Sequence, residues 1–288
     1  MKNILAATLL LSIWIAHAHA FNPNRFVPYQ GESDPYFVEN DPELRSQLRF
    51  CFQFIQSKES FDSDGSTVSY RQEEEHRYSL LTFDARYQVH PHVEIRAIPS
   101  FLSQQVENSL TTWTGQNIGD TWASVKYSRV DSAIRWGGNM GVKFPTGDSS
   151  PNNDDLPTGT GQTDYNFSGF LSYPFEIANL SGGLGYRLRG ENGETKRQPG
   201  NEFHYYLKAE RSLSKNVSMS LMSTGFSGGE GQYDGEELSH SSESIHSLVP
   251  DLVIKIDTLH LSLSTKIDIG GKNYPKSSRL QCSLTYLL

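Results

Sequence analysis

Apolar and polar residues alternate with a period of two over much of the chain after Leu48, and this alternation constrains the fold more than any other feature. In the segment 81–89, for example, Leu, Phe, Ala, Tyr and Val alternate with Thr, Asp, Arg and Gln. Successive side chains of a β-strand point to opposite faces of a sheet, so the pattern predicts strands with one apolar and one polar face. Twelve segments carry it, at 48–54, 81–89, 93–97, 123–128, 134–144, 164–173, 180–189, 203–210, 217–221, 252–257, 259–269 and 280–288.

The connections between these segments alternate in length. Long polar loops are expected near 57–76, 105–117, 146–162, 190–201, 228–246 and 270–277. Tight turns are expected at 90–92, 130–132, 176–178, 214–216 and 257–258. Tight turns on one side and long loops on the other are typical of outer-membrane barrels whose chain ends are both periplasmic. We therefore predict an all-β fold, a transmembrane antiparallel up-and-down β-barrel of about twelve strands, in the cell outer membrane.

Hydropathy is compatible with this prediction. A membrane barrel shows lipid only every second residue, so a hydrophobic fraction of 36% and a mean hydropathy of −0.51 do not argue against it. After residue 20, no run approaches the ~18 apolar residues of a spanning helix. A soluble β-sandwich or lipocalin-like barrel, with its apolar face inward, is the alternative that periodicity alone leaves open.

The chain divides into three parts. Residues 1–20 have the features of a cleaved signal peptide, with Lys2, the apolar run 4–15 and the cleavage motif Ala18-His19-Ala20. Residues 21–45 are irregular and rich in proline, and they form either a periplasmic N-terminal extension or a plug of the barrel. Residues 46–288 form the barrel.

The polar face of the strands is expected to line the lumen. It carries twelve cations, namely Arg49, Arg86, Arg96, Lys126, Arg135, Lys143, Arg187, Arg189, Lys208, Lys255, Lys266 and Arg279. It carries six anions, namely Asp84, Glu94, Asp164, Glu210, Asp257 and Asp268. A narrow lumen with such a surplus would favour anionic solutes, because low-dielectric walls focus the field. Alternatively, the charges pair into a polar plug that fills the barrel.

No catalytic residue, metal or cofactor is expected. The Ser and His pairs His240-Ser241 and His246-Ser247 match no nucleophile motif. The acidic residues of the loop 145–161 lack the spacing of an EF-hand and are interpreted as a solvated surface. The net charge of −8 argues against a nucleic-acid partner. Cys51 and Cys282 are too few for a disulfide scaffold, and the alternation places Cys51 inward and Cys282 outward, which forbids a bond between them.

Three stretches carry a resemblance to a known family. They are Gly119-Asp120-Thr121-Trp122, then 141–148 (GVKFPTGD) running into 156–161 (LPTGTG), and 182–187 (GGLGYR). Together they resemble the meta-pathway phenol-degradation transporter family of outer-membrane proteins, over roughly 115–288. The resemblance implies an outer-membrane location and a role in the uptake of hydrophobic or aromatic compounds, and it carries over no catalytic residue.

The C-terminal end departs from the usual pattern of outer-membrane barrels. Such barrels generally end in an aromatic residue that is recognised during insertion, whereas this chain ends Tyr286-Leu287-Leu288. Tyr286 and Leu288 keep the alternation. The partners expected of the chain are therefore outer-membrane lipid, a small-molecule solute and the barrel-assembly machinery during insertion.

Two functions are consistent with these features. The first is a passive channel or transporter for small solutes, hydrophobic or aromatic by resemblance and biased towards anions by the charge of the lumen. The second is a non-conducting surface barrel whose extracellular loops bind a partner.

Overall fold

The computed structural model describes residues 46–70, 75–107, 112–149 and 155–288, and the predicted signal peptide and N-terminal extension lie outside the described residues. Among the described residues, no helix is long and apolar enough to cross a membrane. The strands are β1 (Gln47–Phe61), β2 (Thr67–Ser69), β3 (Glu75–His90), β4 (Val93–Ile98), β5 (Ser100–Glu107), β6 (Thr112–Ile118), β7 (Thr121–Asp131), β8 (Ile134–Phe144), β9 (Asp164–Pro174), β10 (Asn179–Leu188), β11 (Arg197–Gln198), β12 (Glu202–Ser212), β13 (Val217–Gly228), β14 (Gln232–Tyr233), β15 (Glu236–Glu237), β16 (Ser244–Ile256), β17 (Leu259–Lys272) and β18 (Tyr274–Leu287).

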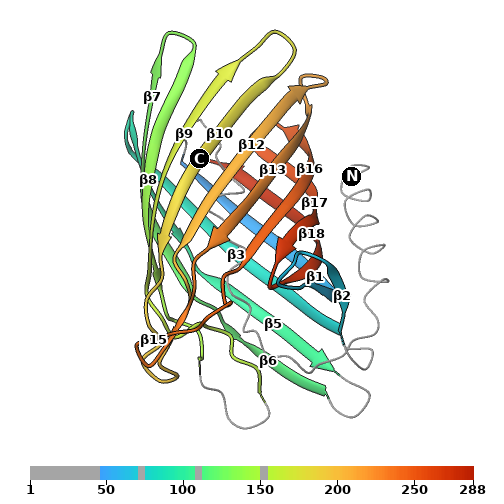
Figure 1. Cartoon of the computed structure of the whole chain (residues 1–288). Coiled ribbons are helices and arrows are strands. Elements are labelled where there is room, and N and C mark those ends of the chain that lie inside the picture. The colour runs from blue at the N-terminus through green and yellow to red at the C-terminus, as the bar shows by residue number, and fades with distance from the viewer. Residues whose placement is uncertain (1–45, 71–74, 108–111, 150–154) are drawn as a thin grey trace.

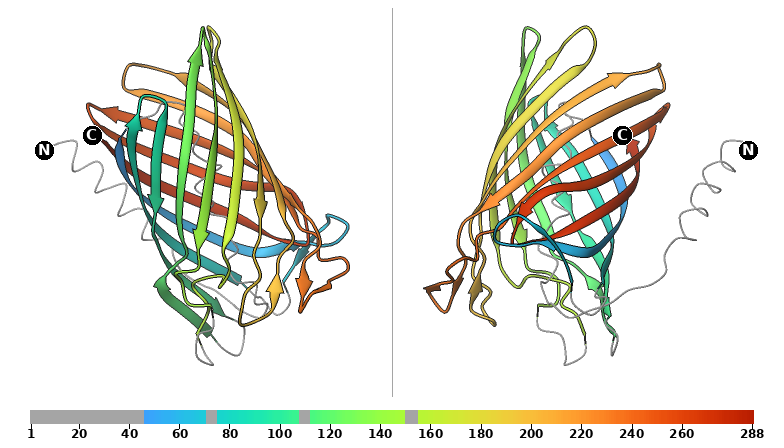
Figure 2. Two further views of the ribbon diagram at one scale, coloured as in Figure 1. Left: turned by 90° about the vertical axis from the view of Figure 1, so that its left-hand side faces the viewer. Right: turned by 45° about the vertical axis from the view of Figure 1, so that its right-hand side comes forward.

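The long strands form one antiparallel sheet that closes on itself (Figures 1 and 2). Strand β1 pairs with β3 on one side and with β18 on the other, so the first and last strands meet at a seam. Strands β4 and β5 lie end to end and form one strand of the wall, as do β6 and β7. Without the short β2, β11, β14 and β15, the closed barrel therefore has twelve strands. The prediction of an all-β, twelve-stranded up-and-down barrel is confirmed.

Two of the barrel strands are interrupted where they cannot continue the hydrogen-bond ladder. Pro99 separates β4 from β5, because proline has no amide N–H to donate. Gly119 and Asp120 separate β6 from β7, and Ser100 holds this break by accepting from the Gly119 amide (3.0 Å) and donating its hydroxyl to the Asp120 carbonyl (2.9 Å). Because Asp120 lies in the second interruption, its side chain need not follow the inward and outward alternation of the strand.

The apolar face of the wall points outward. In β1, for example, Phe50 is 53% exposed, whereas its neighbours Arg49 and Cys51 are 6% and 5% exposed. Leu184 and Leu207, at the middle of other strands, are also exposed. A soluble barrel would bury these side chains, so the direction of the apolar face decides against the soluble alternative.

Five tight turns lie at one end of the barrel, called here the turn end, and the long connections lie at the other, called the loop end (Figure 1). The predicted tight turns are confirmed. The predicted long loop at 270–277 is wrong, because β17 ends at Lys272 and β18 begins at Tyr274. Asn273, at φ +50°, is the single residue between the two strands, which pair with each other only as far as Ile267 and Ser278. Its side-chain amide donates to the carbonyls of two residues of a neighbouring loop, His240 and Ser242. Here the strands continue past the last residues that alternate between apolar and polar. They extend beyond the lipid layer, where the outer face of the wall need not be apolar.

The predicted loops near 57–76 and 105–117 are likewise shorter than expected for the same reason. Strand β1 runs to Phe61, β5 runs to Glu107, and β6 begins at Thr112. A separate small sheet of β11, β14 and β15 stands at the loop end (Figure 1).

The inner face also carries apolar side chains that the alternation did not reveal. One cluster, called here the mid-barrel cluster, comprises Phe170, Tyr206, Met222 and Val249, all at least nine-tenths buried. These residues occupy polar-face positions of β9, β12, β13 and β16, and the interior is therefore amphipathic rather than uniformly polar.

The two cysteines lie on neighbouring strands but on opposite faces. Cys51 is the register partner of Ser283, whereas Cys282 is the register partner of the outward-facing Phe52. Both thiols are free.

This register gives a test of the closing seam. In a Cys282→Ser background, we expect Ser283→Cys to form a disulfide with Cys51 on mild oxidation, because directly opposite residues bring their Cβ atoms within reach of an S–S bond. Mass spectrometry of alkylated peptides from the folded barrel measures it. The control is the unsubstituted chain, in which Cys51 and Cys282 stay unlinked; if the thiol introduced by Ser283→Cys also stayed unlinked to Cys51, the register would be contradicted.

Candidate functional site

The cations predicted to line the lumen all occupy the inner face of the wall. Those at most 9% exposed are Arg49, Arg86, Arg96, Lys126, Lys143, Arg187, Arg189, Lys266 and Arg279. Those half-buried are Arg135, Lys208 and Lys255, which lie nearer the turn end.

Of the predicted inward anions, Asp257 is placed differently. It is exposed and lies in the turn between β16 and β17, at φ +52°, so the prediction that it faces the lumen is wrong. A residue that makes a left-handed turn leaves the alternation of the strand. The sequence also missed three carboxylates of the interior, Asp120, Glu202 and Asp251, so the surplus of cations is smaller than expected.

Most charges near the loop end and along β3 and β4 are paired. Asp84 accepts from both Arg86 and Arg96, each at 2.7 Å. Glu202 contacts Arg187 (3.1 Å), Arg189 and His204. Lys266 pairs with Asp268 at 3.0 Å. Pairing of this kind is required where charges are removed from water.

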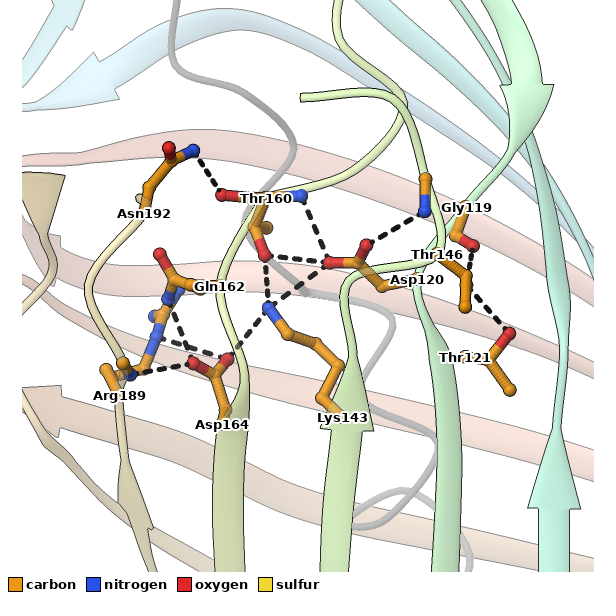
Figure 3. Close-up of polar contacts among 12 residues, drawn as sticks. Gly119, Asp120, Thr121, Lys143, Thr146, Thr160, Gln162, Asp164, Arg189 and Asn192 are labelled. Atoms are coloured by element: carbon orange, nitrogen blue, oxygen red, sulfur yellow. Dashed lines mark hydrogen bonds and ion pairs between the residues drawn. The ribbon is translucent and has the colours of Figure 1, made fainter. Parts of the chain in front are cut away.

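Asp120 is the centre of a polar cluster at the loop end (Figure 3). Its carboxylate accepts from the amides of Gly147 (3.3 Å) and Thr160 (3.0 Å) and from the Thr160 hydroxyl (2.7 Å). The ammonium of Lys143 lies 3.2 Å from the same carboxylate. One buried side chain thus joins three segments that are separate in sequence, and these segments contain two of the three stretches that carry the family resemblance.

The cluster continues around the wall through Lys143. Its ammonium also pairs with Asp164 at 2.8 Å, and Asp164 in turn accepts from Gln162 (2.9 Å) and lies 3.5 Å from Arg189 (Figure 3). Adjacent strands β8, β9 and β10 position these charges, since Lys143 is the register partner of Asp164. The chain of alternating charges fixes the loop end of the wall.

The segment 155–163, called here the inner segment, is held by this cluster and covers the free edge of β6. Leu156 donates its amide to Thr114 (2.8 Å). Thr158 donates its hydroxyl to the Ile118 carbonyl (3.0 Å). On the inner face of the wall, Gln104 donates to the Pro157 carbonyl. An otherwise unpaired strand edge is therefore satisfied by the chain itself.

Glycines allow the inner segment to approach other backbone closely. A Cβ added to Gly159 would lie 2.6 Å from the Cα of Gly147, and one added to Gly115 would lie 2.2 Å from the Leu156 carbonyl oxygen. Both distances are too short for any side chain. Glycine is thus required at these two positions because the backbones of two segments lie in contact there.

Among the described residues, two cavities on the inner side of the wall bear on a path through the barrel. The mouth cavity, about 270 Å³, lies at the loop end between the inner segment and the loops that follow β10 and β13. The inner chamber, about 340 Å³, is lined by inner-face residues nearer the turn end. Met222 and Val249 of the mid-barrel cluster form part of the chamber wall.

Glu243 lines the mouth cavity just before β16 begins. Burial, opposed by the positive charges of Arg189 and Arg197 and aided by the negative charge of Glu202, raises the pKa of this carboxyl to about 7. The charge of the mouth therefore changes near neutral pH.

The described residues hold no group of three His, Cys, Asp or Glu side chains placed to bind a metal ion. Asp148 and Asp155, from the acidic loop, are exposed, and Asp154 lies outside the described residues. His246 lies on the outer wall, where its imidazole contacts the hydroxyls of Tyr205 (2.8 Å) and Ser223 (3.3 Å).

Comparison with known proteins gives a family and a set of barrels. Residues 55–284 match the model of a family described as "Putative MetA-pathway of phenol degradation". No curated protein sequence matches. Among solved structures, an outer-membrane channel from Pseudomonas putida F1 superposes with a TM-score of 0.69 at 16% identity, covering 87% of this chain and 99% of that one. The translocator domain of the autotransporter NalP from Neisseria meningitidis gives a TM-score of 0.49 at 10% identity, covering 84% and 88%.

The polar cluster gives a second prediction. We expect Asp120→Asn to lower the free energy of unfolding by roughly 1–3 kcal/mol, because it removes a buried charge that accepts several hydrogen bonds and leaves Lys143 with one carboxylate fewer. Urea unfolding in lipid vesicles measures this change. The exposed Asp148→Asn in the same loop is the matched control, and equal stabilities of the two variants would contradict the anchoring role of Asp120.

Proposed function

The chain belongs to the phenol-degradation MetA-pathway family of outer-membrane β-barrels, and from this premise we propose that it is a passive conduit for small solutes across the outer membrane. The observation that carries the proposal is the pair of cavities inside a closed wall whose apolar face points outward. A wall of this kind needs lipid around it, and cavities inside it, lined largely by polar side chains, are where small solutes would pass through the lipid layer.

The charge of the interior supports a preference for anions. The cations of the inner face outnumber its carboxylates, and those towards the turn end include the half-buried Lys208 and Lys255 at the inner chamber. A low-dielectric wall around such charges raises the local concentration of anions.

The class of solute follows from the amphipathic interior. Two members of the mid-barrel cluster, Met222 and Val249, line the chamber, and the aromatic Phe170 and Tyr206 belong to the same cluster, which favours solutes with an apolar or aromatic body. This agrees with the compounds that the family resemblance implies.

The rival proposal is a non-conducting surface barrel whose loops bind a partner. It is favoured by the small sheet of β11, β14 and β15, which stands at the loop end, and by the many buried charges that pair with one another. Under this proposal the interior is a structural plug.

Single-channel recording of the purified barrel in a planar bilayer tests the two proposals. If the barrel is a conduit, we expect discrete conductance steps. Under a gradient of KCl, we expect a reversal potential whose sign shows that chloride passes more readily than potassium. A sealed barrel under all conditions would favour the loop-binding proposal, and cation preference would contradict the role assigned to the inner cations.

A pH dependence of this preference is also expected. Glu243 is neutral below its pKa of about 7 and anionic above it, so the preference for anions should fall as the pH rises through 7. The variant Glu243→Gln should lose this step. Reversal potentials measured between pH 5.5 and 8.5 give the result. The exposed Glu236→Gln is the control that keeps the step, and an unchanged step in Glu243→Gln would assign it to another group.

A further inference from the structure

The inner chamber contains a row of polar side chains that crosses four adjacent strands near the turn end. Arg49 of β1 is the register partner of Thr285 of β18, Thr285 is the partner of His260 of β17, and His260 is the partner of Lys255 of β16. All four line the chamber. This set, called here the cationic row, spans three strand spacings, roughly 14 Å, so its two long end side chains can both reach a small solute between them.

The charge of the chamber wall is positive. Its cations are Arg49, Arg86, Lys208 and Lys255, and its carboxylates are Glu210 and Asp251. Glu210 pairs with Lys208 at 2.7 Å, and Asp251 accepts the Ser262 hydroxyl at 2.6 Å. Lys255 has no carboxylate within 4 Å among the described residues, so its charge faces the cavity uncompensated by an ion pair.

Hydroxyl groups lie beside the cationic row. Ser218, Ser264 and Ser283 line the chamber and are at most 6% exposed. The Ser283 hydroxyl has no hydrogen-bond partner among the described residues. A buried donor without a partner costs free energy unless a ligand atom accepts its hydrogen bond, and an oxyanion is such an acceptor.

Towards the middle of the barrel, the chamber has an apolar patch on β13 and β16, beside the polar Ser264 and Gln281 of β17 and β18. Met222 and Val249 are register partners, and on their strands they are the lining residues farthest from the tight turns. Behind them lie Phe170 and Tyr206 of the mid-barrel cluster. The chamber is therefore polar and cationic towards the turn end and carries an apolar patch, formed by Met222 and Val249, towards the middle of the barrel.

We propose that the inner chamber is a binding site for small carboxylates with an apolar body, whose carboxylate lies at the cationic row and whose body contacts Met222 and Val249. The proposal rests on the conduit proposed above and specifies it: such solutes cross by way of a saturable site. Neutral solutes of the same shape lack the charge for the row, and inorganic anions lack the body for the apolar patch.

Two measurements on the purified full chain test the site, with benzoate as the probe and benzyl alcohol as its neutral counterpart. Calorimetric titration in detergent measures binding, and single-channel recording measures interruption of the current by added benzoate. We expect saturable benzoate binding at least about tenfold tighter than that of benzyl alcohol, because only the carboxylate carries a charge that pairs with the cations, and it accepts from the Ser283 hydroxyl more strongly than an alcohol oxygen does.

Variants locate the site. We expect Arg49→Gln and Lys255→Gln each to weaken benzoate binding roughly three- to tenfold, and Lys255→Arg to restore most of it. Lys215→Gln, in an exposed turn, removes the same charge from the chain and should leave benzoate binding unchanged. The heat-dependent electrophoretic migration of each variant reports whether it is folded. The comparison of benzoate with benzyl alcohol uses the unsubstituted chain, so it tests the site even if a variant fails to fold.

The outcomes separate this inference from the proposed conduit. Conductance steps without saturable benzoate binding would overturn the chamber site and leave the conduit standing. Benzoate binding in detergent by a barrel that never conducts would keep the site and overturn the conduit. Equal binding of benzoate and benzyl alcohol, or unchanged binding in the Arg49→Gln/Lys255→Gln double variant, would overturn the inference.

Discussion

Closure of the β1–β18 seam is the constraint on which the rest of the structure depends. Within lipid, no water can pair with backbone N–H and C=O groups, so a sheet with open edges is not viable there. Pairing of β1 with β18 closes the sheet, so that each of the twelve strands of the wall has a neighbour on both sides, apart from the edge of β6 that the inner segment covers. Once the sheet is closed, the two faces of each strand have different surroundings, lipid outside and the interior inside, and the alternation of the sequence follows from this difference.

Where the strands extend beyond the alternating segments, hydrogen bonds and ion pairs between side chains, rather than contact with lipid, hold the wall in place. The interruption between β6 and β7 frees Asp120, and its carboxylate joins the ends of β7 and β8 to the inner segment. The glycines of the same motifs permit the close backbone approaches that this arrangement requires. The resemblance stretches 119–122, 141–148 and 156–161 are thus held together by one side chain, and residues of the last of them line the mouth cavity.

The interior combines paired and uncompensated charge. Near the loop end, carboxylates such as Asp164 and Glu202 each contact two cations. These ion pairs hold neighbouring strands together and leave this part of the inner face with a small net charge. Towards the turn end, Lys255 has no paired carboxylate among the described residues, and the hydroxyls of β17 and β18 line a cavity. Rigid pairing at one end and available charge at the other are what a conduit with a defined mouth and an anion-preferring chamber requires.

The sequence by itself determined the period of the strands, their number and the tight turns, because each follows from local alternation and from turn residues. It also placed the cations together on the polar face by parity. Which face points inward was decided by the tertiary structure, because the alternation is the same for a soluble barrel and for a membrane barrel. The sequence could not give the length of strands beyond the lipid level, where the outer face need not be apolar, nor that Asn273 is the single residue between β17 and β18. Only the tertiary structure decided which charges pair, that Asp120 gathers three distant segments, that Asp257 leaves the inner face, and that Met222 and Val249 meet across strands. These contacts join residues that are far apart in the chain, and their partners are set by strand register and barrel closure rather than by neighbouring residues.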